Sequence, residues 1–232
     1  MASSLDGPRI PPKNRVAKQL VVFLHGYGAD GDDLIAIGKQ WQSLLPDAAF
    51  VSPHAPHPCA QAPTGRQWFP LNMSNPDELW QGVVDARPAL DAFLDAELAR
   101  LKLDDSRLAL VGFSQGTMMA LHVGLRRSRA PAAILGYSGV LVGPEHLLEA
   151  NARDGHGRPP PIFLIHGNED DLISVESLFL AAEDLNKANI PCQWHMSVGI
   201  GHGIDTGGLL HGGLFVSKSL GVKTPADVKV RT

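Results

Sequence analysis

The sequence predicts an α/β fold built on a mostly parallel central sheet with helices on both faces. Short unbroken apolar runs, such as residues 20–24 and 108–111, are typical of strands buried on both faces. Segments with helical apolar spacing alternate with these runs, which is the order of a βα repeat. Reactive residue types gather directly after the runs, where open α/β sheets place their sites.

Length and composition indicate a single domain. A chain of 232 residues with 44% hydrophobic content can bury a sizeable core. We expect an N-terminal arm over residues 1–18, one domain over 19–220 and a C-terminal tail over 221–232. The net charge is −4, with a positive excess at both ends and an acidic remainder, so no basic groove is expected and nucleic-acid binding is disfavoured.

The sequence also indicates the compartment. The first eighteen residues contain no apolar stretch of the signal-peptide kind, and no run approaches the roughly 18 apolar residues of a membrane span. Cys59 and Cys192 are too few and too far apart in sequence to suggest a disulfide scaffold. We therefore expect a cytoplasmic protein with no integral membrane segment.

The first elements lead to a glycine-rich turn. The arm is expected to add a short edge strand around Arg9 and Ile10, and residues 20–24 form the first buried strand. The turn from His25 to Gly31 follows, before a helix over residues 33–45 and a strand over 48–51. Such a turn places backbone N–H groups beside the sheet's carboxyl end. It is either an ordinary connection or one half of an oxyanion hole.

Residues 52–75 form a proline- and histidine-rich segment that is too long to be a plain connector. It collects Trp68, Phe69, Leu71 and Met73, so we expect it to fold over the pocket mouth or the sheet edge. His54, His57 and Cys59 have a spacing that could bind a metal. No fourth ligand is close in sequence, so we interpret them as turn residues.

A long helix is expected next, and it is a scaffold element. Asn75 and Pro76 provide a good helix start, and leucines recur at helical spacing as far as residue 101. Pro88 is expected to kink this helix or divide it.

The rest of the chain is organised around Ser114. The apolar run 108–111 leads into Gly112-Phe113-Ser114-Gln115-Gly116, and a helix apolar on nearly every side continues to about residue 127. A serine on a tight strand-to-helix turn needs glycine two residues to either side to avoid collision. The turn exposes the Ser114 hydroxyl, while the N–H of Gln115 lies at the helix N-terminus, where developing negative charge is stabilised.

Three further strands complete the prediction. Residues 132–137 form a strand ending at Ser138, which lacks the flanking glycines and is interpreted as structural. Residues 161–165 form the next strand, followed by His166-Gly167-Asn168-Glu169-Asp170-Asp171 and a helix that Ser174 can cap. The last strand covers residues 192–198, and a final helix covers 205–220. Between them His202 lies among glycines.

These positions suggest nucleophilic catalysis. A serine hydroxyl needs a histidine to take its proton and an acid to fix that histidine's tautomer. Of the ten histidines, His202 is favoured, because a glycine-flanked loop after the last strand can bring its ring over the sheet. Glu169, Asp170 and Asp171 compete as the acid, and the pattern does not separate them.

Four ordered motifs resemble the phospholipase/carboxylesterase family of α/β-hydrolases, to which acyl-protein thioesterases belong: His25-Gly26-Tyr27-Gly28, residues 112–116, His166-Gly167-Asn168-Glu169-Asp170 and Gly201-His202. The resemblance spans roughly residues 19–220. It implies the α/β-hydrolase fold, Asp170 as the acid and the Tyr27 N–H as an oxyanion donor beside that of Gln115. It also implies that Trp68 and Phe69 lie near the acyl pocket.

The chain departs from the family pattern at two positions. Asp171 stands where a proline usually follows the acid, and Pro70 stands where an acid usually follows the aromatic pair. A second carboxylate therefore lies beside Asp170, and the acyl pocket is expected to be altered. We expect Leu71 and Leu172 to contact the substrate as well.

The sequence therefore predicts a serine hydrolase that cleaves carboxylic esters, with thioesters and lysophospholipids in range, through an acyl-serine intermediate. It would need no metal or cofactor and would take a small-molecule or lipid acyl ester. A homodimer is left open. The alternative is a non-catalytic binding protein of α/β-hydrolase fold, and a metal-dependent hydrolase using His54 and His57 is a remote third interpretation.

Overall fold

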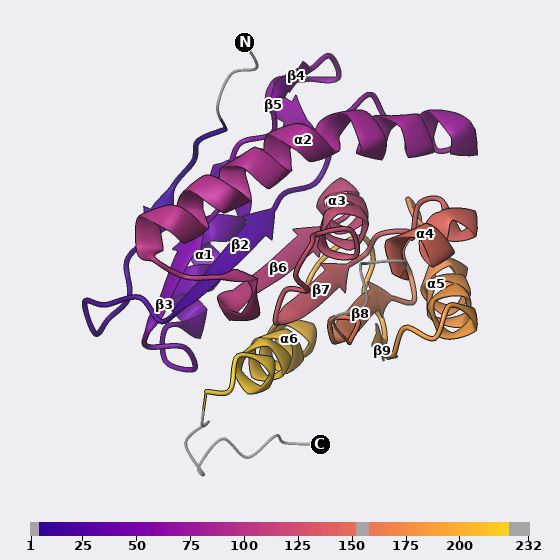
Figure 1. Ribbon diagram of the computed structural model, residues 1–232. Coiled ribbons are helices and arrows are strands. Elements are labelled where there is room, and N and C mark those ends of the chain that lie inside the picture. The colour runs from indigo at the N-terminus through magenta and orange to yellow at the C-terminus, as the bar shows by residue number, and fades with distance from the viewer. Residues whose placement is uncertain (1–4, 152–157, 223–232) are drawn as a thin grey trace.

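The computed structural model describes residues 5–151 and 158–222 and contains one mixed sheet of seven strands in the order β1-β3-β2-β6-β7-β8-β9 (Figure 1). Its strands are β1 (Arg9–Ile10), β2 (Gln19–Leu24), β3 (Ala48–Val51), β6 (Leu108–Phe113), β7 (Ala133–Tyr137), β8 (Ile162–Gly167) and β9 (Cys192–Ser197). The pair β1–β3 is antiparallel and the other pairs are parallel. The predicted fold class is confirmed, as is the edge strand at Arg9 and Ile10. Residues 223–232 of the predicted tail lie outside the described residues.

Helices cover both faces of the sheet. One hydrophobic cluster joins the sheet to α2 (Pro76–Leu101), α3 (Gln115–Gly124) and α5 (Glu176–Lys187), and a second joins it to α1 (Gly31–Trp41) and α6 (Thr206–Ser219). Shorter helical segments are η1 (Asp105–Arg107), η2 (Pro144–His146) and α4 (Leu147–Asn151). Within the described residues, no helix combines the length and hydropathy that crossing a bilayer requires.

Helix boundaries differ from the prediction where a capping side chain decides them. Helix α1 begins at Gly31, earlier than predicted, because the Asp30 carboxylate accepts the Asp32 N–H at 2.9 Å. Asn75 caps α2 as predicted, accepting from the N–H groups of Asp77 and Glu78. Helix α2 is continuous over 26 residues, so Pro88 does not divide it. Pro88 and Val84 are exposed, and water can therefore bond the Val84 carbonyl that the proline leaves unpaired.

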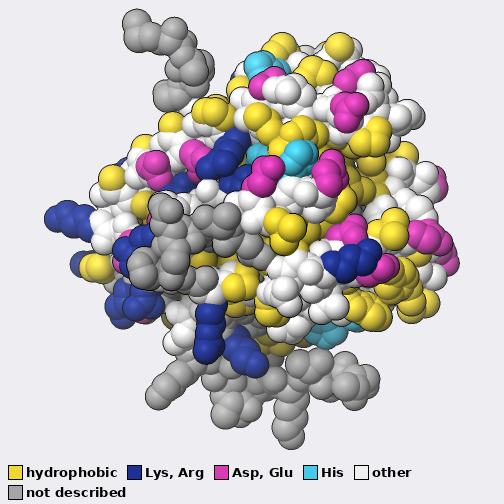
Figure 2. All heavy atoms as spheres, turned by 45° about the vertical axis from the view of Figure 1, so that its right-hand side comes forward, with side chains coloured by type: hydrophobic (Ala, Val, Ile, Leu, Met, Phe, Trp, Pro, Cys, Tyr) yellow, Lys and Arg dark blue, Asp and Glu magenta, His cyan; other side chains and the backbone are white. Residues whose placement is uncertain are grey.

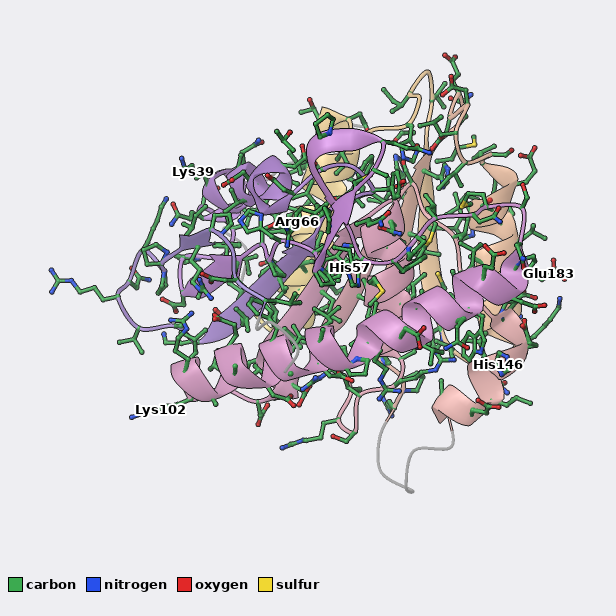
Figure 3. The ribbon with its side chains drawn as sticks, turned by 90° about the horizontal axis from the view of Figure 1, so that it is seen from above. Lys39, His57, Arg66, Lys102, His146 and Glu183 are labelled. Carbon is green, nitrogen blue, oxygen red and sulfur yellow. The ribbon has the colours of Figure 1, made fainter. Side chains whose placement is uncertain are left out.

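The segment predicted as one long loop contains a β-hairpin. Strands β4 (His57–Cys59) and β5 (Ala62–Gln67) pair antiparallel, apart from the main sheet. Arg66 ties the hairpin back to the chain after β3, since its guanidinium donates to the carbonyls of Ala55 at 2.7 Å and Pro56 at 3.2 Å. Figure 1 shows the hairpin above the main sheet, and Figure 3 labels Arg66 and His57 in this region.

The two edges of the sheet are unlike each other. Strand β1 covers β3, whereas β9 pairs only with β8 among the described strands. The exposed rings of Phe179 on α5 and Trp194 on β9 pack edge to face, with 5.3 Å between their centroids. Hydrophobic side chains are visible among charged ones on the side of the molecule that carries α5 (Figure 2).

Candidate active site

Ser114 lies at a sharp turn between the central strand β6 and helix α3. Its backbone has φ 53° and ψ −116°, a conformation that residues with a side chain rarely adopt. The turn is held by its own backbone, because the Ser114 N–H donates to the Tyr137 carbonyl at 2.9 Å and its carbonyl accepts from Thr117 N–H at 2.9 Å. The strained serine is therefore fixed by neighbouring strand β7 and by the first turn of α3.

The glycines beside this turn are sterically required. A Cβ on Gly112 would lie 2.4 Å from backbone atoms of Gly116, and one on Gly116 would lie 1.8 Å from the Leu24 carbonyl oxygen. Both distances are too short for a side chain. The structure thus confirms that a side chain at either position would collide with the backbone.

His202 and Asp170 form a hydrogen-bonded pair. The Nδ1 of His202 lies 2.8 Å from Asp170 Oδ2, and the Asp170 side chain is fully buried. Since a carboxylate accepts, Nδ1 carries the hydrogen and the ring's other nitrogen is left to accept a proton. Asp171, the adjacent alternative, is exposed. Of the three candidate acids, Asp170 is the one that the structure places against His202.

The charge on Asp170 is held by several donors. Its Oδ1 accepts the N–H groups of Leu172 at 3.0 Å and Ile173 at 2.9 Å. Burial alone would raise the pKa of Asp170, but these N–H groups and the His202 ring outweigh burial and lower that pKa below its ordinary value. Asp170 is therefore ionised at neutral pH.

The loops after β8 and β9 are tied to each other. Asn168 N–H donates to the Ser197 carbonyl at 3.0 Å, Glu169 N–H donates to the Ile200 carbonyl at 2.9 Å, and the Asn168 side chain accepts Gly199 N–H at 2.6 Å. These bonds join the acid's loop to the histidine's loop directly. The spacing between Asp170 and His202 is consequently set by backbone contacts.

The turn after β2 packs against Ser114. A Cβ on Gly26 would lie 3.3 Å from the Ser114 Cβ, so the turn approaches the serine closely. Strand β5 braces the turn, because Gly28 N–H donates to the Arg66 carbonyl at 2.9 Å and Arg66 N–H donates to the Ala29 carbonyl at 2.8 Å. Tyr27 N–H takes no acceptor within the described part of the chain. Gln115 N–H, in the first turn of α3, has no intrahelical acceptor either.

Ser114, His202 and Tyr27 line one cleft of about 390 Å³. Its apolar walls come from Leu71, Met73, Phe113, Leu172 and Ile173. The Phe113 and His202 rings lie 5.0 Å apart between centroids, which places the imidazole beside the serine turn. The cleft brings the predicted reactive residues together with Leu71 and Leu172.

Trp68 and Phe69 lie elsewhere, in the hydrophobic core. They are 1% and 2% exposed and do not line the cleft. Trp68 Nε1 donates to the His25 carbonyl at 3.0 Å. The buried Gln115 side chain accepts Trp68 N–H at 3.0 Å and donates to the Phe69 carbonyl at 2.8 Å. The aromatic pair therefore supports the turn after β2 and the residue next to Ser114 from beneath.

Comparison with known sequences places this arrangement in context. The sequence profile of the phospholipase/carboxylesterase family matches residues 5–219. The chain belongs to this family. The match covers almost the whole chain, including the loops that carry Ser114, Asp170 and His202.

Relatives of this family member include acyl-protein thioesterase 1 of Gibberella zeae, 25% identical over 87% of this chain and 91% of that one. Esterase YpfH of Escherichia coli is 29% identical over 83% of this chain and 79% of that one. The crystal structure of esterase PE8 is 41% identical, with a TM-score of 0.87 over 93% of this chain and 99% of that one. The family member is accordingly an ester-cleaving hydrolase, as predicted, and the non-catalytic alternative is set aside.

His54, His57 and Cys59 of this phospholipase/carboxylesterase family member do not come together. His54 Nδ1 accepts the Gly31 N–H at 3.1 Å, and His57 is exposed. Across residues 5–151 and 158–222, no group of three or more His, Cys, Asp or Glu side chains is arranged to hold a metal ion. The geometry therefore gives no support to the metal-dependent interpretation.

Several residues of the site were missed from the sequence. Gln61 in the hairpin turn and Ile173 line the cleft, and the Ser138 hydroxyl donates to the Gly203 carbonyl at 3.4 Å beside His202. Met73 lines the cleft as well, as expected for the apolar residues of its segment. The proline-rich composition of residues 52–75 concealed the hairpin. Ser138 could have been placed near the site from the sequence, because it directly follows the strand that comes after the Ser114 turn and its helix.

Proposed function

We propose that the protein hydrolyses carboxylic esters through an acyl-serine intermediate, with Ser114 as nucleophile, His202 as base and Asp170 as its partner. The observation that carries the proposal is the single cleft shared by the strained Ser114 turn and by His202, whose Nδ1 lies 2.8 Å from Asp170. Any one of these features also occurs in structural roles. Their coincidence in a cleft supports nucleophilic catalysis.

The first half-reaction forms the acyl-enzyme. Because Nδ1–H of His202 donates to Asp170, its Nε2 is unprotonated and can take the proton of the Ser114 hydroxyl. The Ser114 oxygen attacks the ester carbonyl, and the carbonyl oxygen becomes an oxyanion. His202 then gives its proton to the leaving alcohol, and the ester C–O bond breaks. Asp170 stays ionised throughout and stabilises the imidazolium.

The second half-reaction releases the acid. A water molecule loses its proton to His202 and attacks the acyl carbonyl, and Ser114 departs with the returned proton. In both halves the N–H groups of Tyr27 and Gln115 are proposed to stabilise the oxyanion. Each such donor is worth about 3 to 4 kcal/mol in the transition state. Support comes from the lack of another acceptor for either N–H within the described residues.

The cleft suits a small-molecule or lipid acyl ester. Leu71 and Leu172, with the other apolar residues of the cleft, offer hydrophobic contact to an acyl chain at about 0.8 kcal/mol for each buried methylene. Thioesters and lysophospholipids carry the same reacting carbonyl and are included in the proposal. No cofactor takes part in any step.

The proposed site residues lie on one chain, and the homodimer that the sequence leaves open stays a prediction. The cytoplasm remains the proposed compartment. Its support is that both cysteines are free thiols, as expected in a reducing environment.

Replacing the nucleophile tests the proposal. Ser114→Ala should remove nearly all turnover of a chromogenic short-chain ester, and intact mass should show no fluorophosphonate adduct. Ser138→Ala is the matched control, because Ser138 also has positive φ at a strand end and should keep the label. Chelator should leave wild-type activity unchanged. Labelling of Ser114→Ala, or turnover that depends on an added metal, would overturn the assignment.

The oxyanion assignment has a test of its own. In a crystal structure of the phosphonylated enzyme, one phosphonyl oxygen should lie within hydrogen-bond distance of both Tyr27 N–H and Gln115 N–H. An oxygen bonded to neither group would remove these two residues from the mechanism while leaving Ser114 in place.

A further inference from the structure

A second buried histidine contacts the acid of the proposed triad. His166, in strand β8, is 1% exposed, and its Nε2 lies 2.8 Å from the Ile173 carbonyl oxygen and 3.1 Å from Asp170 Oδ2. Both neighbours are hydrogen-bond acceptors. The Nε2 atom of His166 must therefore carry a hydrogen, which it donates to the Ile173 carbonyl, and Asp170 Oδ2 lies close to the same N–H.

The Asp170 carboxylate consequently has ring or backbone N–H groups close to both of its oxygens. Oδ1 accepts the N–H groups of Leu172 and Ile173, while Oδ2 lies between His202 Nδ1 at 2.8 Å and His166 Nε2 at 3.1 Å. Because the side chain is fully buried, water does not replace a missing donor. Two imidazoles from different elements thus share one carboxylate oxygen.

His166 does more than fill space in the core, because it contacts both Asp170 and a residue that binds Asp170. Ile173 donates its N–H to Asp170 and accepts from His166 through its carbonyl, and the His166 Nε2 lies 3.1 Å from Asp170 Oδ2, so the three residues are in mutual polar contact. His166 is part of the buried strand β8, whereas Asp170 lies in the loop that follows it. These contacts therefore anchor the loop that carries the acid to the sheet.

We propose that His166 is a positioning residue for catalysis, fixing the Asp170 carboxylate through Nε2–H and sharing Oδ2 with His202. This inference rests on the proposed function, since it assigns His166 a role toward the acid of that triad. His166 touches neither substrate nor Ser114 in this role. It acts through Asp170 alone.

Sharing Oδ2 has a measurable effect on the acid limb of the pH–rate profile. A donor on Oδ2 reduces the negative charge that Asp170 presents to His202. Removing that donor strengthens the attraction of Asp170 for the protonated His202 ring, so the base stays protonated to higher pH. The acid limb of kcat/KM should then move to higher pH. Without the His166 contact, Asp170 is also less fixed in position and orients the His202 ring less accurately, so kcat should fall.

Few other charges face this pair. Glu169 and Asp171 lie on the same loop and are exposed. Asp205, at the start of α6, is occupied by the Ser197 hydroxyl at 2.7 Å and by two backbone N–H groups of its own helix. No Lys or Arg side chain in the described residues bonds to Asp170 or His202. The shift can therefore be attributed to the His166 contact.

Three variants test the inference. His166→Phe keeps the volume and removes the donor, and His166→Gln places an amide N–H near the Nε2 position. His122→Phe is the matched control, because His122 is a buried histidine that packs against Trp80 and not against Asp170. Rates are normalised to the fraction of enzyme labelled by a fluorophosphonate, so misfolded protein does not contribute.

We expect His166→Phe to lower kcat by at least about tenfold and to move the acid limb upward by about half a pH unit or more. His166→Gln should restore both toward wild type, and His122→Phe should leave the limb unmoved. If His166→Phe does not fold, His166→Asn replaces it, since its shorter amide does not reach Oδ2. An unmoved acid limb, or a Gln variant no better than Phe or Asn, would overturn the inference. Turnover in Ser114→Ala close to the wild-type rate would instead overturn the proposed function.

Discussion

Replacing Gln115 by methionine should destabilise the protein strongly, although Gln115 contributes only its backbone to the proposed mechanism. The side chain is fully buried and satisfies two backbone groups, Trp68 N–H and the Phe69 carbonyl. Methionine has a similar length and no comparable hydrogen-bonding group, so both backbone groups would be left buried and unpaired. Each costs about 1 to 3 kcal/mol, which gives a loss of roughly 2 to 6 kcal/mol.

The assay is thermal unfolding followed by far-ultraviolet circular dichroism. At about 2 to 4 °C per kcal/mol for a protein of this size, Tm should fall by at least about 4 °C. Gln19 provides the matched control, because it is a buried glutamine whose Oε1 has no partner among the described residues. Gln19→Met removes an unpaired acceptor and should be close to neutral. If the two variants lost equal stability, the hydrogen bonds of Gln115 would not be the cause.

Three further outcomes are expected. Gly116→Ala should not yield a folded, active enzyme, because its Cβ would lie 1.8 Å from a backbone oxygen of β2; normal expression and circular dichroism would contradict this. Leu71→Ala should reduce kcat/KM for long acyl esters more than for acetyl esters, whereas Trp68→Ala, which removes a core side chain, should lower the urea midpoint and affect all chain lengths alike. Burial lowers the pKa of His25 to about 4 and that of His122 to about 3, so the unfolded state binds their protons first and the free energy of unfolding should fall as pH drops below about 6.5. For His25 the loss approaches about 3 kcal/mol near pH 4, and a urea midpoint unchanged between pH 6.5 and 4.5 would refute it.

Much of the fold could be predicted because buried parallel strands have a strong local signal. The run at residues 20–24 and the run at 108–111 are apolar on both faces, and each became a strand of the sheet within one or two residues. The glycines at 112 and 116 could be interpreted from sterics alone, because the elbow leaves no room for a Cβ. Local rules sufficed at these positions.

Contacts between distant segments could not be predicted in the same way. The hairpin β4–β5 is held by Arg66 bonds to Ala55 and to the turn after β2, and no local pattern signals them. Trp68 and Phe69 were expected at the acyl pocket because apolar side chains in a loop suit a cleft. They pack inward, where the Gln115 side chain bonds the Trp68 N–H and the Phe69 carbonyl.

The acid of the triad also could not be chosen from the local sequence. Asp170 and Asp171 are chemically equivalent in the sequence, and the family resemblance was needed to prefer the first. In the structure they differ because the N–H groups of Leu172 and Ile173 turn Asp170 inward while Asp171 is exposed. The direction of the backbone in this loop decides which carboxylate faces His202. Two identical neighbouring residues give no sign of that direction in the sequence.

The position of β9 at an edge of the sheet, where β8 is its one partner among the described strands, affects how the enzyme would lose activity on heating. His202 lies in the loop that follows β9, while Ser114 follows β6 at the centre of the sheet. Edge strands open at a lower free-energy cost than central ones, since fewer contacts must break. Opening of β9 would carry away the base and leave the nucleophile in place. Thermal inactivation should therefore precede global unfolding, and hydrogen exchange in β9 should rise at the temperature where turnover begins to fall.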